Sequence, residues 1–600
     1  MTWPDRSPAV AVFLIFTVAG CNRDEPAIRA RAPSDARGER EFAGSSLLVV
    51  TLDTVRRDAL GFSQAGGTLV ASTPVLDALA ARSLELTHTW SVAPVTLPAH
   101  ASLFTGNHPV AHGVHDNLGF QLPQSATTLA ERLAREGVTT GAVFAAPVVG
   151  PQSGLAQGFE TYQGPTFDSG LVERPARWVS EVALAMLDRM ASVDGPFFLW
   201  AHYFDAHAPH EAGLGVARAR RGGVASMEDD RAAYRLEIER IDRQLGRLLD
   251  GAFAAARARP LCIVVTADHG EALGDHGEAT HGHLLHDSTM RVPLLIHHPR
   301  IPPGRCSQTS SLVDLLPTLL ELFDLPKEEP LQGQSLVPWL LDQGARERPS
   351  PRIVCFETRL PWHEFGWAWL DGACDGRFKW VDRPSPEVFD LDLDPGESRA
   401  ILEAQHALVD SLAGAVRQLQ MKSASFAPAA GAGECSALTN LGYVAARRTA
   451  PENKEDLAEP EDRLALVGIR DRGLEALGRG DFAGALAEFG KLRLGNPDPA
   501  PASMLIAVTY SRHAESVAES AERMAVLEHA AAAWRDAVEI CPADALRHYN
   551  LAMTLMDLGR PTQAIPELER CVELAPEDGK AREQLAHARR QQAPPSKDRR

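Results

Sequence analysis

The sequence predicts an α/β unit with a mostly parallel sheet flanked by helices, followed by an all-α unit. Two observations predict this order within the 600 residues. Short apolar runs alternate with amphipathic stretches from Ser46 to about Leu340, and small and apolar residues then recur in phase after Asp462. A chain of this length exceeds what one hydrophobic core covers, so two or three folded units are expected.

Five apolar runs are the expected buried strands of the sheet: Ser46–Leu52, Thr139–Ala145, Phe197–Phe204, Leu261–Ala267 and Val292–His297. Runs of this length, separated by amphipathic segments, are typical of parallel strands covered on both faces. The stretch Arg231–Ala252 carries its apolar residues on one face, which predicts a covering helix. Shorter strand-like pieces between residues 353 and 400 predict a small second sheet at the end of this unit.

Residues 462–590 carry an internal repeat. Pro542 and Pro576 are 34 residues apart and are preceded by small or apolar residues at equivalent offsets, whereas the step from Pro497 to Pro542 is 45 residues. The pattern resembles tetratricopeptide repeats, in which each helix pair buries its face against the next. An ordinary helical bundle is the alternative. The resemblance implies a protein or peptide partner for this unit, by analogy alone.

The first 21 residues predict an export signal. An apolar stretch, Ala9–Val18, is followed by small residues and then by Cys21. This resembles a bacterial lipoprotein signal, whose cysteine is lipidated and becomes the new N-terminus; a plain signal peptide or a core helix is the alternative. The resemblance implies an exported lipoprotein of the cell envelope, periplasmic or on the outer-membrane side, held to the membrane through Cys21.

Two polar segments divide the rest of the chain. Residues 22–44 are rich in Arg, Pro and Ala and suit a tether, and residues 422–461 are rich in Ala, Pro, Gly and charged residues and suit a linker. The catalytic unit is therefore expected at residues 45–421. A net charge of −19 without a long basic block argues against a nucleic-acid partner. The cysteines after Cys21 have no CxxC spacing, so packed thiols are expected rather than a zinc site, although export would permit disulfides.

Three of the predicted strands end in groups that could bind a metal or catalyse a reaction. Asp53 follows the first strand, Asp268-His269 follows the strand Leu261–Ala267, and Asp205-Ala206-His207 follows the strand at Phe197. Open α/β sheets place ligands outside the carboxyl ends of their strands, so these side chains are expected to share one site. Carboxylate and imidazole ligands suit a divalent ion such as Zn, Mn, Mg or Ca.

Thr96 precedes a predicted helix, because Pro98 suits a first helical turn. A hydroxyl at that end lies in the positive field of the helix, as would an anionic ester beside it. From this segment alone, a threonine that only caps the helix is the favoured interpretation.

Five segments occur in the order seen in sulfatases: Asp53–Arg56, Thr96–Gly106, His112–Val114, Ala267–Glu271 and Arg291–Leu294. Over residues 45–420 the chain therefore resembles the sulfatase branch of the alkaline phosphatase superfamily. The resemblance implies an alkaline-phosphatase-like sheet, a small C-terminal sheet, and hydrolysis of sulfate or phosphate esters carried on a small molecule, a glycan or a lipid head group.

Position by position, the resemblance also implies site residues. Asp53, Asp268 and His269 match metal ligands, and Thr96 matches the nucleophile that also touches the metal. Asn117 matches an asparagine that steadies a non-bridging oxygen of the ester. Two histidines match positions near the ester and its leaving group: His207 and His281, with His283 the less favoured claimant to the second.

The chain departs from the family at three positions. The Cys-x-Pro-x-Arg frame reads Thr96-Leu97-Pro98-Ala99-His100, and the usual second aspartate is Thr54. Threonine cannot be oxidised to an aldehyde, so no formylglycine is expected. Phosphorus chemistry therefore becomes at least as plausible as sulfate hydrolysis. His100, in the place of the arginine, is expected to stabilise charge on the ester oxygens, and His207 or His281 to protonate the leaving alcohol.

Several alternatives remain open on the sequence alone. The chain could be a phosphoryl-group transferase of the same superfamily, or a degenerate non-catalytic scaffold that binds proteins through its repeats. A second metal would need further ligands such as Asp205, His207 and His281, but these lack the Asp-x-x-x-His spacing of two-zinc relatives, so one metal is preferred. The remaining histidines are expected to be packed or solvated: His88, His108, His202, His210, His276, His286, His297 and His298.

Overall fold

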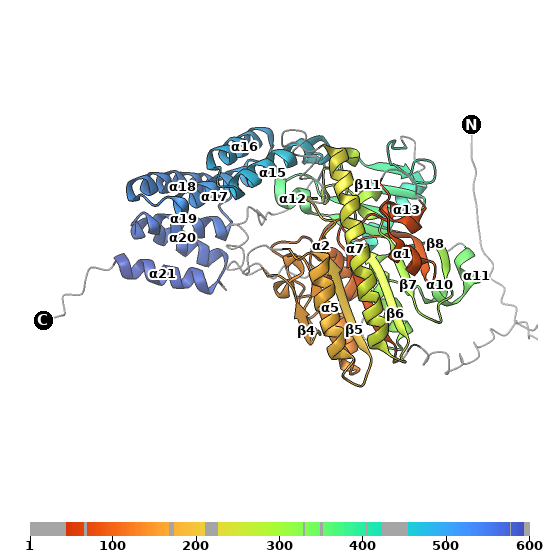
Figure 1. Ribbon diagram of the computed structural model, residues 1–600. Coiled ribbons are helices and arrows are strands. Elements are labelled where there is room, and N and C mark those ends of the chain that lie inside the picture. Colours follow the sequence, from red (N-terminus) through yellow and green to blue (C-terminus); the bar gives the residue numbers. More distant parts are fainter. Residues whose placement is uncertain are drawn as a thin grey trace, which may run out of the picture.

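The computed structural model describes an α/β unit and a helical unit (Figure 1). The described residues are 42, 44–64, 69–166, 173–210, 226–327, 330–348, 352–401, 406–422, 454–576 and 578–592. The expected export signal, the tether apart from residues 42 and 44, and the linker between residues 423 and 453 lie outside this part of the chain.

The main sheet has eight strands in the order β4-β3-β5-β1-β6-β7-β2-β8. At its centre β1 (Ser46–Leu52) pairs in parallel with β5 (Phe197–Tyr203) on one side and β6 (Leu261–Ala267) on the other. Beyond β5 the parallel pairing continues through β3 (Thr139–Phe144) to β4 (Thr161–Gln163). The residues of β1, β5 and β6 are buried throughout, as their apolar runs predict.

The other edge of the sheet differs from the prediction. β7 (Leu294–His297) was expected to be parallel, but it pairs antiparallel with both β6 and β2 (Leu84–Trp90). The connection from β6 to β7 contains only short helical turns and no helix that could cross the face of the sheet, as parallel pairing usually requires. β2 and β8 (Gly304–Ser311) escape prediction because polar residues interrupt their runs.

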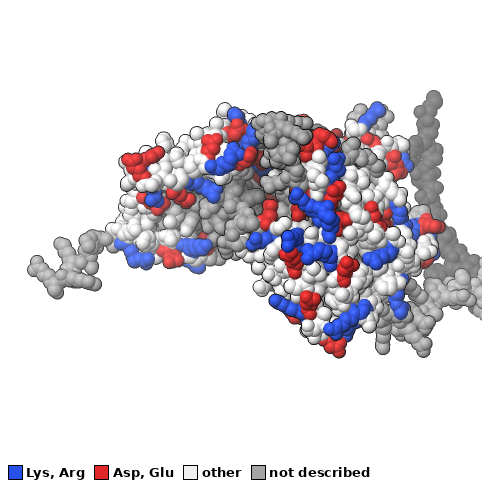
Figure 2. Space-filling model, in the orientation of Figure 1, with Lys and Arg blue, Asp and Glu red and all other residues white. Residues whose placement is uncertain are grey.

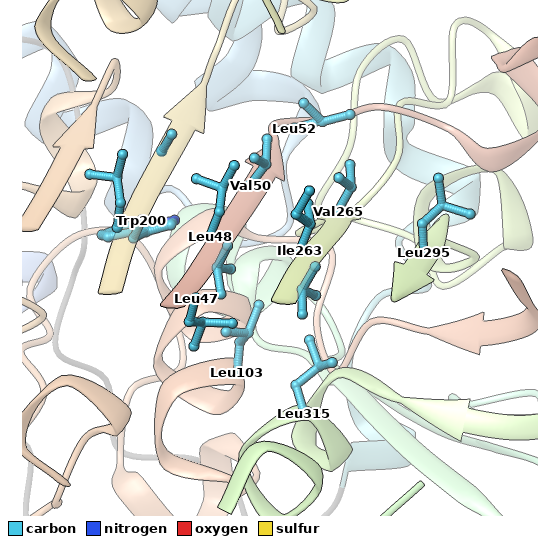
Figure 3. Close-up of a cluster of buried hydrophobic side chains, with 14 of the residues drawn as sticks. Leu47, Leu48, Val50, Leu52, Leu103, Trp200, Ile263, Val265, Leu295 and Leu315 are labelled. Atoms are coloured by element: carbon cyan, nitrogen blue, oxygen red, sulfur yellow. The ribbon is translucent and has the colours of Figure 1, made fainter. Parts of the chain in front are cut away.

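Helices cover the sheet and complete its core. α7 (Met227–Ala256) buries the predicted apolar face of Arg231–Ala252 and packs against α5 (Ala176–Met190). It begins earlier than predicted because Ser226 and Asp229 form a capping box at its start. The core cluster in Figure 3 joins side chains of the central strands to Leu103 of α2 (Thr96–Thr105) and to Leu315 of α9 (Leu315–Leu322). Each fully buried side chain of this size contributes roughly 1.5–3 kcal/mol to folding.

A second, antiparallel sheet follows in the order β12-β11-β10-β9, which confirms the small C-terminal sheet. Its strands are β9 (Val354–Thr358), β10 (Leu370–Cys374), β11 (Phe378–Asp382) and β12 (Glu387–Asp390). The helix α13 (His406–Lys422) packs on β10 and β11.

The C-terminal unit is all-helical, as predicted. Its seven described helices each pack against the next: α15 (Leu464–Gly478), α16 (Phe482–Gly495), α17 (Ala500–Ser516), α18 (Ser520–Ile540), α19 (Ala545–Asp557), α20 (Pro561–Leu574) and α21 (Gly579–Gln592). Phe489, Trp534 and Leu568, which occupy repeating apolar positions, are buried. The longer middle unit lies in α17 and α18, which are the longest helices of the set. The tetratricopeptide assignment stays a prediction.

The two units are joined by side chains of the segment that connects β9 to β10. This segment forms α12 (Leu360–Phe365), and Phe365 stacks on Trp367 with ring centroids 4.1 Å apart. Both rings belong to the buried core of the helical unit. Trp367 Nε1 donates to Asn496 Oδ1 at 2.7 Å, and Asn496 Nδ2 donates to the Phe365 carbonyl at 2.9 Å. The junction is therefore a packed interface.

On the face shown in Figure 2, Lys and Arg are interspersed with Asp and Glu over both units. In the part of the chain that the structure describes, every helix is too short or too polar to cross a bilayer.

Candidate active site

The carboxyl ends of β1 and β6 bring the two predicted aspartates together. Leu52 and Ala267 are register partners, so Asp53 and Asp268, the next residues of the two strands, follow side by side. The backbone amide of Asp53 also donates to the Tyr203 carbonyl of β5 at 2.9 Å. Asp53, Asp268 and His269 are completely buried, and one ligand atom from each lies within 4.8 Å of the others.

Thr96 lies beside this group at the first turn of α2. Its Oγ1 is 3.3 Å from His269 Nε2 and 3.4 Å from Asp53 Oδ2. Val95, rather than Thr96, is the N-cap residue, and no side chain caps the helix. The hydroxyl of Thr96 is therefore directed to the carboxylate group and is not used as a helix cap.

The carboxylates are incompletely satisfied by protein groups. Asp53 Oδ1 and Asp268 Oδ2 have no hydrogen-bond partner among the described residues. Burial raises the pKa of Asp53 to about 7, although His269 offsets part of the shift. Buried carboxylates without partners are costly unless a cation joins them. The two carboxylates, the imidazole and the nearby hydroxyl together fit a divalent cation.

Thr54 does not add a ligand. Its Oγ1 lies 2.8 Å from the carbonyl oxygens of both Asp53 and Ala206, and its backbone has a φ of 57°, in the left-handed region. Its amide instead donates to Asp268 Oδ1 at 3.3 Å, and the amide of His269 donates to the same oxygen at 2.8 Å. These two donors hold the Asp268 carboxylate in place.

A pocket of about 660 Å³ opens next to Thr96. At its inner end Val95, Asn117, His207 and His281 are among the lining residues. Asn117 Oδ1 accepts the backbone N–H of Leu97 at 2.8 Å, which leaves the Asn117 amide nitrogen as a donor for a bound group. The structure thus brings the predicted oxygen-binding asparagine to the start of α2.

His207 and His281 lie together in the pocket wall. Their ring centroids are 5.0 Å apart, and the His281 ring is 4.4 Å from that of His269. His281 Nδ1 lies 3.1 Å from Glu271 Oε1. Burial lowers the pKa of His281 to about 4 and that of His207 well below its usual value, so neither titrates near neutral pH in the free pocket, contrary to expectation. An anionic ester beside them would favour their protonated forms.

His100 packs beside the metal-ligand group, with its Nδ1 3.7 Å from Asp268 Oδ2. One turn after Thr96 on α2, it is fully buried and does not line the pocket. Its Nδ1 is 2.8 Å from the Thr96 carbonyl, and its Nε2 is 3.0 Å from Thr51 Oγ1. Because protein atoms engage both ring nitrogens, His100 supports the start of α2 and the end of β1. Its expected part in stabilising charge on the ester oxygens stays a prediction.

His202 is the site residue that the sequence analysis missed, since it was expected to be packed or solvated. It is the register partner of Thr51, and its Nε2 lies 3.4 Å from Asp53 Oδ2. The ring is completely buried, and its Nδ1 is 3.2 Å from Thr51 Oγ1. The signal was present: His202 is an imidazole in the otherwise apolar run of β5.

The ligands considered for a second metal do not assemble. Asp205 interacts with the backbone of Ala176 and with Glu237 and Arg240, on the side of α5 and α7. A separate trio of possible ligands, His276, His286 and Glu397, lies outside the pocket lining. The two rings stack with centroids 3.5 Å apart and planes within 8° of parallel. No single ion can lie in both ring planes, so this trio is a packing cluster.

None of the cysteines that the structure describes lies among the site residues or the pocket lining. The described thiols are free, and all are buried except Cys541, which is partly exposed. This confirms packed thiols for the described part of the chain; Cys21 and Cys435 lie outside it.

Comparison with known proteins agrees with this geometry. The sulfatase family model matches residues 45–325. Arylsulfatase A of Homo sapiens is 26% identical over 446 residues, covering 61% of this chain and 86% of the human protein. The solved phosphonate monoester hydrolase of Agrobacterium radiobacter superposes with a TM-score of 0.50 at 20% identity, covering 63% of this chain and 95% of that chain.

A further solved structure, a complex with its substrate D-glucosamine-2-N,6-O-disulfate, superposes with a TM-score of 0.53 at 18% identity and covers 63% of this chain and 97% of that chain. These structural likenesses establish the fold, and the family model and the relatives establish its family. Residues 45–325 therefore form a domain of the sulfatase family, within the alkaline phosphatase superfamily.

Proposed function

We propose that this chain is a hydrolase of sulfate or phosphorus esters that depends on a single divalent metal ion and uses Thr96 as its nucleophile. The observation that carries the proposal is the position of Thr96 Oγ1, 3.4 Å from Asp53 Oδ2 and 3.3 Å from His269 Nε2. A threonine that served only the helix would direct its hydroxyl to the backbone. Family members of both chemistries exist, an arylsulfatase and a phosphonate monoester hydrolase.

Asp53, Asp268 and His269 would hold the ion, with Thr96 beside it. A bound divalent cation lowers the pKa of an adjacent hydroxyl and neutralises charge on an anionic ester. Thr96 Oγ then attacks sulfur or phosphorus as the bond to the leaving oxygen breaks, and its proton passes to Asp53 Oδ2, 3.4 Å away, which returns it when the threonine hydroxyl is regenerated. The amide nitrogen of Asn117 donates to a non-bridging oxygen of the ester.

The leaving alcohol takes its proton from His207 or His281, which line the same pocket and which a bound anion would bring to their protonated form. Water attacks the sulfur or phosphorus atom of the Thr96 ester in the second step, which regenerates the threonine hydroxyl and releases the acid. The neutral imidazole left by the first step can accept a proton from that water.

The predicted export signal and repeats suggest where the enzyme is located and what its helical unit binds. We place the enzyme at the bacterial envelope through a lipidated Cys21, with the helical unit as a tetratricopeptide platform for a protein or peptide. Both assignments rest on the sequence patterns described above. N-terminal mass spectrometry of the membrane fraction tests the first, because a Cys21→Ser variant should lose the lipid and leave the membrane.

The nucleophile is tested by comparing Thr96→Ala with Thr96→Ser in full-length protein loaded with different divalent metals. Aryl sulfate, aryl phosphate mono- and diester, and aryl phosphonate substrates cover the candidate reactions. We expect Thr96→Ala to lose at least about 10³-fold in kcat and Thr96→Ser, which keeps a hydroxyl, to retain measurable turnover.

Activity that survives Thr96→Ala would exclude the nucleophile. A folded, metal-binding wild type that hydrolyses none of these esters would favour the non-catalytic scaffold, and turnover only with an acceptor alcohol would favour a transferase.

A further inference from the structure

The helical unit forms part of the wall of the active-site pocket. Four residues of α15 are among those lining it: Arg470, Asp471, Arg472 and Glu475. They lie together with residues of α12 and of the catalytic loops, and Figure 1 shows α15 and α12 side by side at the junction of the two units. The α/β unit alone therefore does not enclose this pocket.

The connection between this wall and the helical unit is built into α12. Leu360, His363 and Glu364 of α12 line the pocket, whereas Phe365 at its end is buried in the core of the helical unit. Arg470 of α15 forms an ion pair with Glu364. α12 thus contributes both to the pocket and to the core that joins the two units. Its packing and the ion pair between Glu364 and Arg470 hold α15 beside the pocket.

The charged groups of this wall are already paired. Glu364 Oε2 lies 3.0 Å from His283 Nε2 and also contacts Arg470. Asp116 Oδ2 lies 2.9 Å from His363 Nδ1. The remaining pairs are Arg470 with Asp471 at 2.8 Å, Arg472 with Glu488 at 3.1 Å, and Glu475 with Arg479.

Burial alone would raise the pKa of Glu364, but Arg470 and His283 outweigh it and lower the pKa to about 2. Burial likewise opposes the charged form of His283, but hydrogen bonds with Glu278 and Glu364 raise its pKa to about 9. Both groups are therefore charged and mutually neutralised at neutral pH. Each arginine among the described lining residues has a carboxylate partner, so none is left over to bind a second anionic group.

Paired carboxylates and guanidinium groups still present acceptors and N–H donors at fixed positions. Such groups suit a ligand that both donates and accepts hydrogen bonds without adding charge, as hydroxyl groups do. The volume, about 660 Å³, lies within the range of sites for drug-sized ligands and exceeds what one ester group fills.

We propose that α15 and α12 form an outer subsite for the alcohol part of the substrate, and that this subsite takes an uncharged, hydroxyl-rich group such as a neutral sugar. The inference rests on the proposed function, because Thr96 and the metal group at the inner end fix where the ester lies. It assigns the helical unit a part in substrate selection in addition to any partner that it binds.

The test compares two insertions of tryptophan in the full-length chain. Asp471, whose side chain is 47% exposed, lines the pocket, so Asp471→Trp should fill the outer subsite without disturbing a core. Ala465 is also exposed and on α15 but does not line the pocket, so Ala465→Trp is the matched control. Each variant is assayed with a 4-nitrophenyl ester and with the same ester on neutral trisaccharides of glucose, galactose or N-acetylglucosamine.

We expect Asp471→Trp to lower kcat/KM for the best trisaccharide ester, relative to the 4-nitrophenyl ester, by at least tenfold, and Ala465→Trp to leave this ratio within twofold of wild type. An unchanged ratio in Asp471→Trp would overturn the proposal. So would a trisaccharide ester that becomes a better substrate when it carries a second sulfate.

A binding measurement separates this inference from the proposed function. Calorimetry of Thr96→Ala with the free neutral trisaccharides reports on the subsite even if no ester is hydrolysed. Binding by Thr96→Ala that is lost in the Thr96→Ala/Asp471→Trp double variant supports the subsite. Failure of every trisaccharide to bind, or binding that the second substitution does not change, contradicts it.

Discussion

Carboxylates near the two ends of the pocket differ in whether protein groups pair with them. Behind the inner end, in the buried metal-ligand group, Asp53 Oδ1 and Asp268 Oδ2 lack hydrogen-bond partners among the described residues. At the outer end, Glu364 lies between His283 and Arg470. Both ends were built from carboxylates and histidines, so composition alone does not distinguish them.

The difference indicates which end needs a ligand to complete it. Unpaired buried carboxylates raise the free energy of the folded protein, and a cation that joins them removes this cost. Paired carboxylates stabilise the fold. They and their partners can still form hydrogen bonds with an uncharged substrate group. We therefore expect a metal ion and the anionic ester group to bind at the inner end, and an uncharged, hydroxyl-rich group to bind at the outer end.

The largest expected effect comes from neutralising the inner end. Asp268→Asn should lower kcat by about 10³-fold, because it removes a metal-ligating charge. In metal-free buffer the same variant should be more stable than wild type by about 1–3 kcal/mol, because it removes a buried charge of which one oxygen, Oδ2, has no hydrogen-bond partner among the described residues. Steady-state kinetics measures the loss of kcat, and denaturant unfolding with and without metal measures the change in stability. If the variant were less stable than wild type in metal-free buffer, protein groups would already satisfy the Asp268 carboxylate.

A smaller effect is expected from pH at the outer end. The folded-state pKa of His283 is about 9, above its usual value of 6.5, so its stabilisation is fully present below pH 6.5 and is lost as the pH rises through 9. At 1.36 kcal/mol per pKa unit this amounts to roughly 3 kcal/mol. The free energy of unfolding of wild type should fall between pH 7 and pH 10, and that of His283→Gln should fall less. If the free energy of unfolding fell equally with pH in wild type and in His283→Gln, the titration of His283 would not contribute to stability.

The smallest effect concerns the joint that holds the two units together. Asn496→Ala removes the hydrogen bonds with Trp367 and with the Phe365 carbonyl, which should cost about 1–2 kcal/mol. Limited proteolysis should then separate the helical unit from the α/β unit faster than in wild type. Asn550→Ala, at a partly buried position on α19, is a matched control whose cleavage rate should stay near that of wild type.

The sequence predicted the parts of the molecule whose signals are local. β1, β6 and α7 follow from apolar runs and periodicity, and Asp53 and Asp268 follow from strand ends. These features are encoded within a few residues of one another, so a single chain suffices to find them.

The parts that were missed depend on tertiary contacts. β2 and β8 carry polar residues in their runs, and the direction of β7 depends on a loop that does not cross the sheet. His202 joins the site only because β5 pairs with β1. The wall formed by α15 needs the packing of Phe365 and Trp367 in the helical core, which no local pattern indicates.

The stereochemical course of hydrolysis distinguishes attack by Thr96 from direct attack by water. An aryl phosphate diester or aryl phosphonate monoester made chiral at phosphorus with oxygen isotopes is hydrolysed by the metal-loaded wild type in water labelled with the third isotope, and the configuration of the product is determined. Attack by Thr96 followed by attack of water inverts the configuration twice, so we expect overall retention. Overall inversion would mean that water attacks the ester directly, and it would contradict Thr96 as the nucleophile.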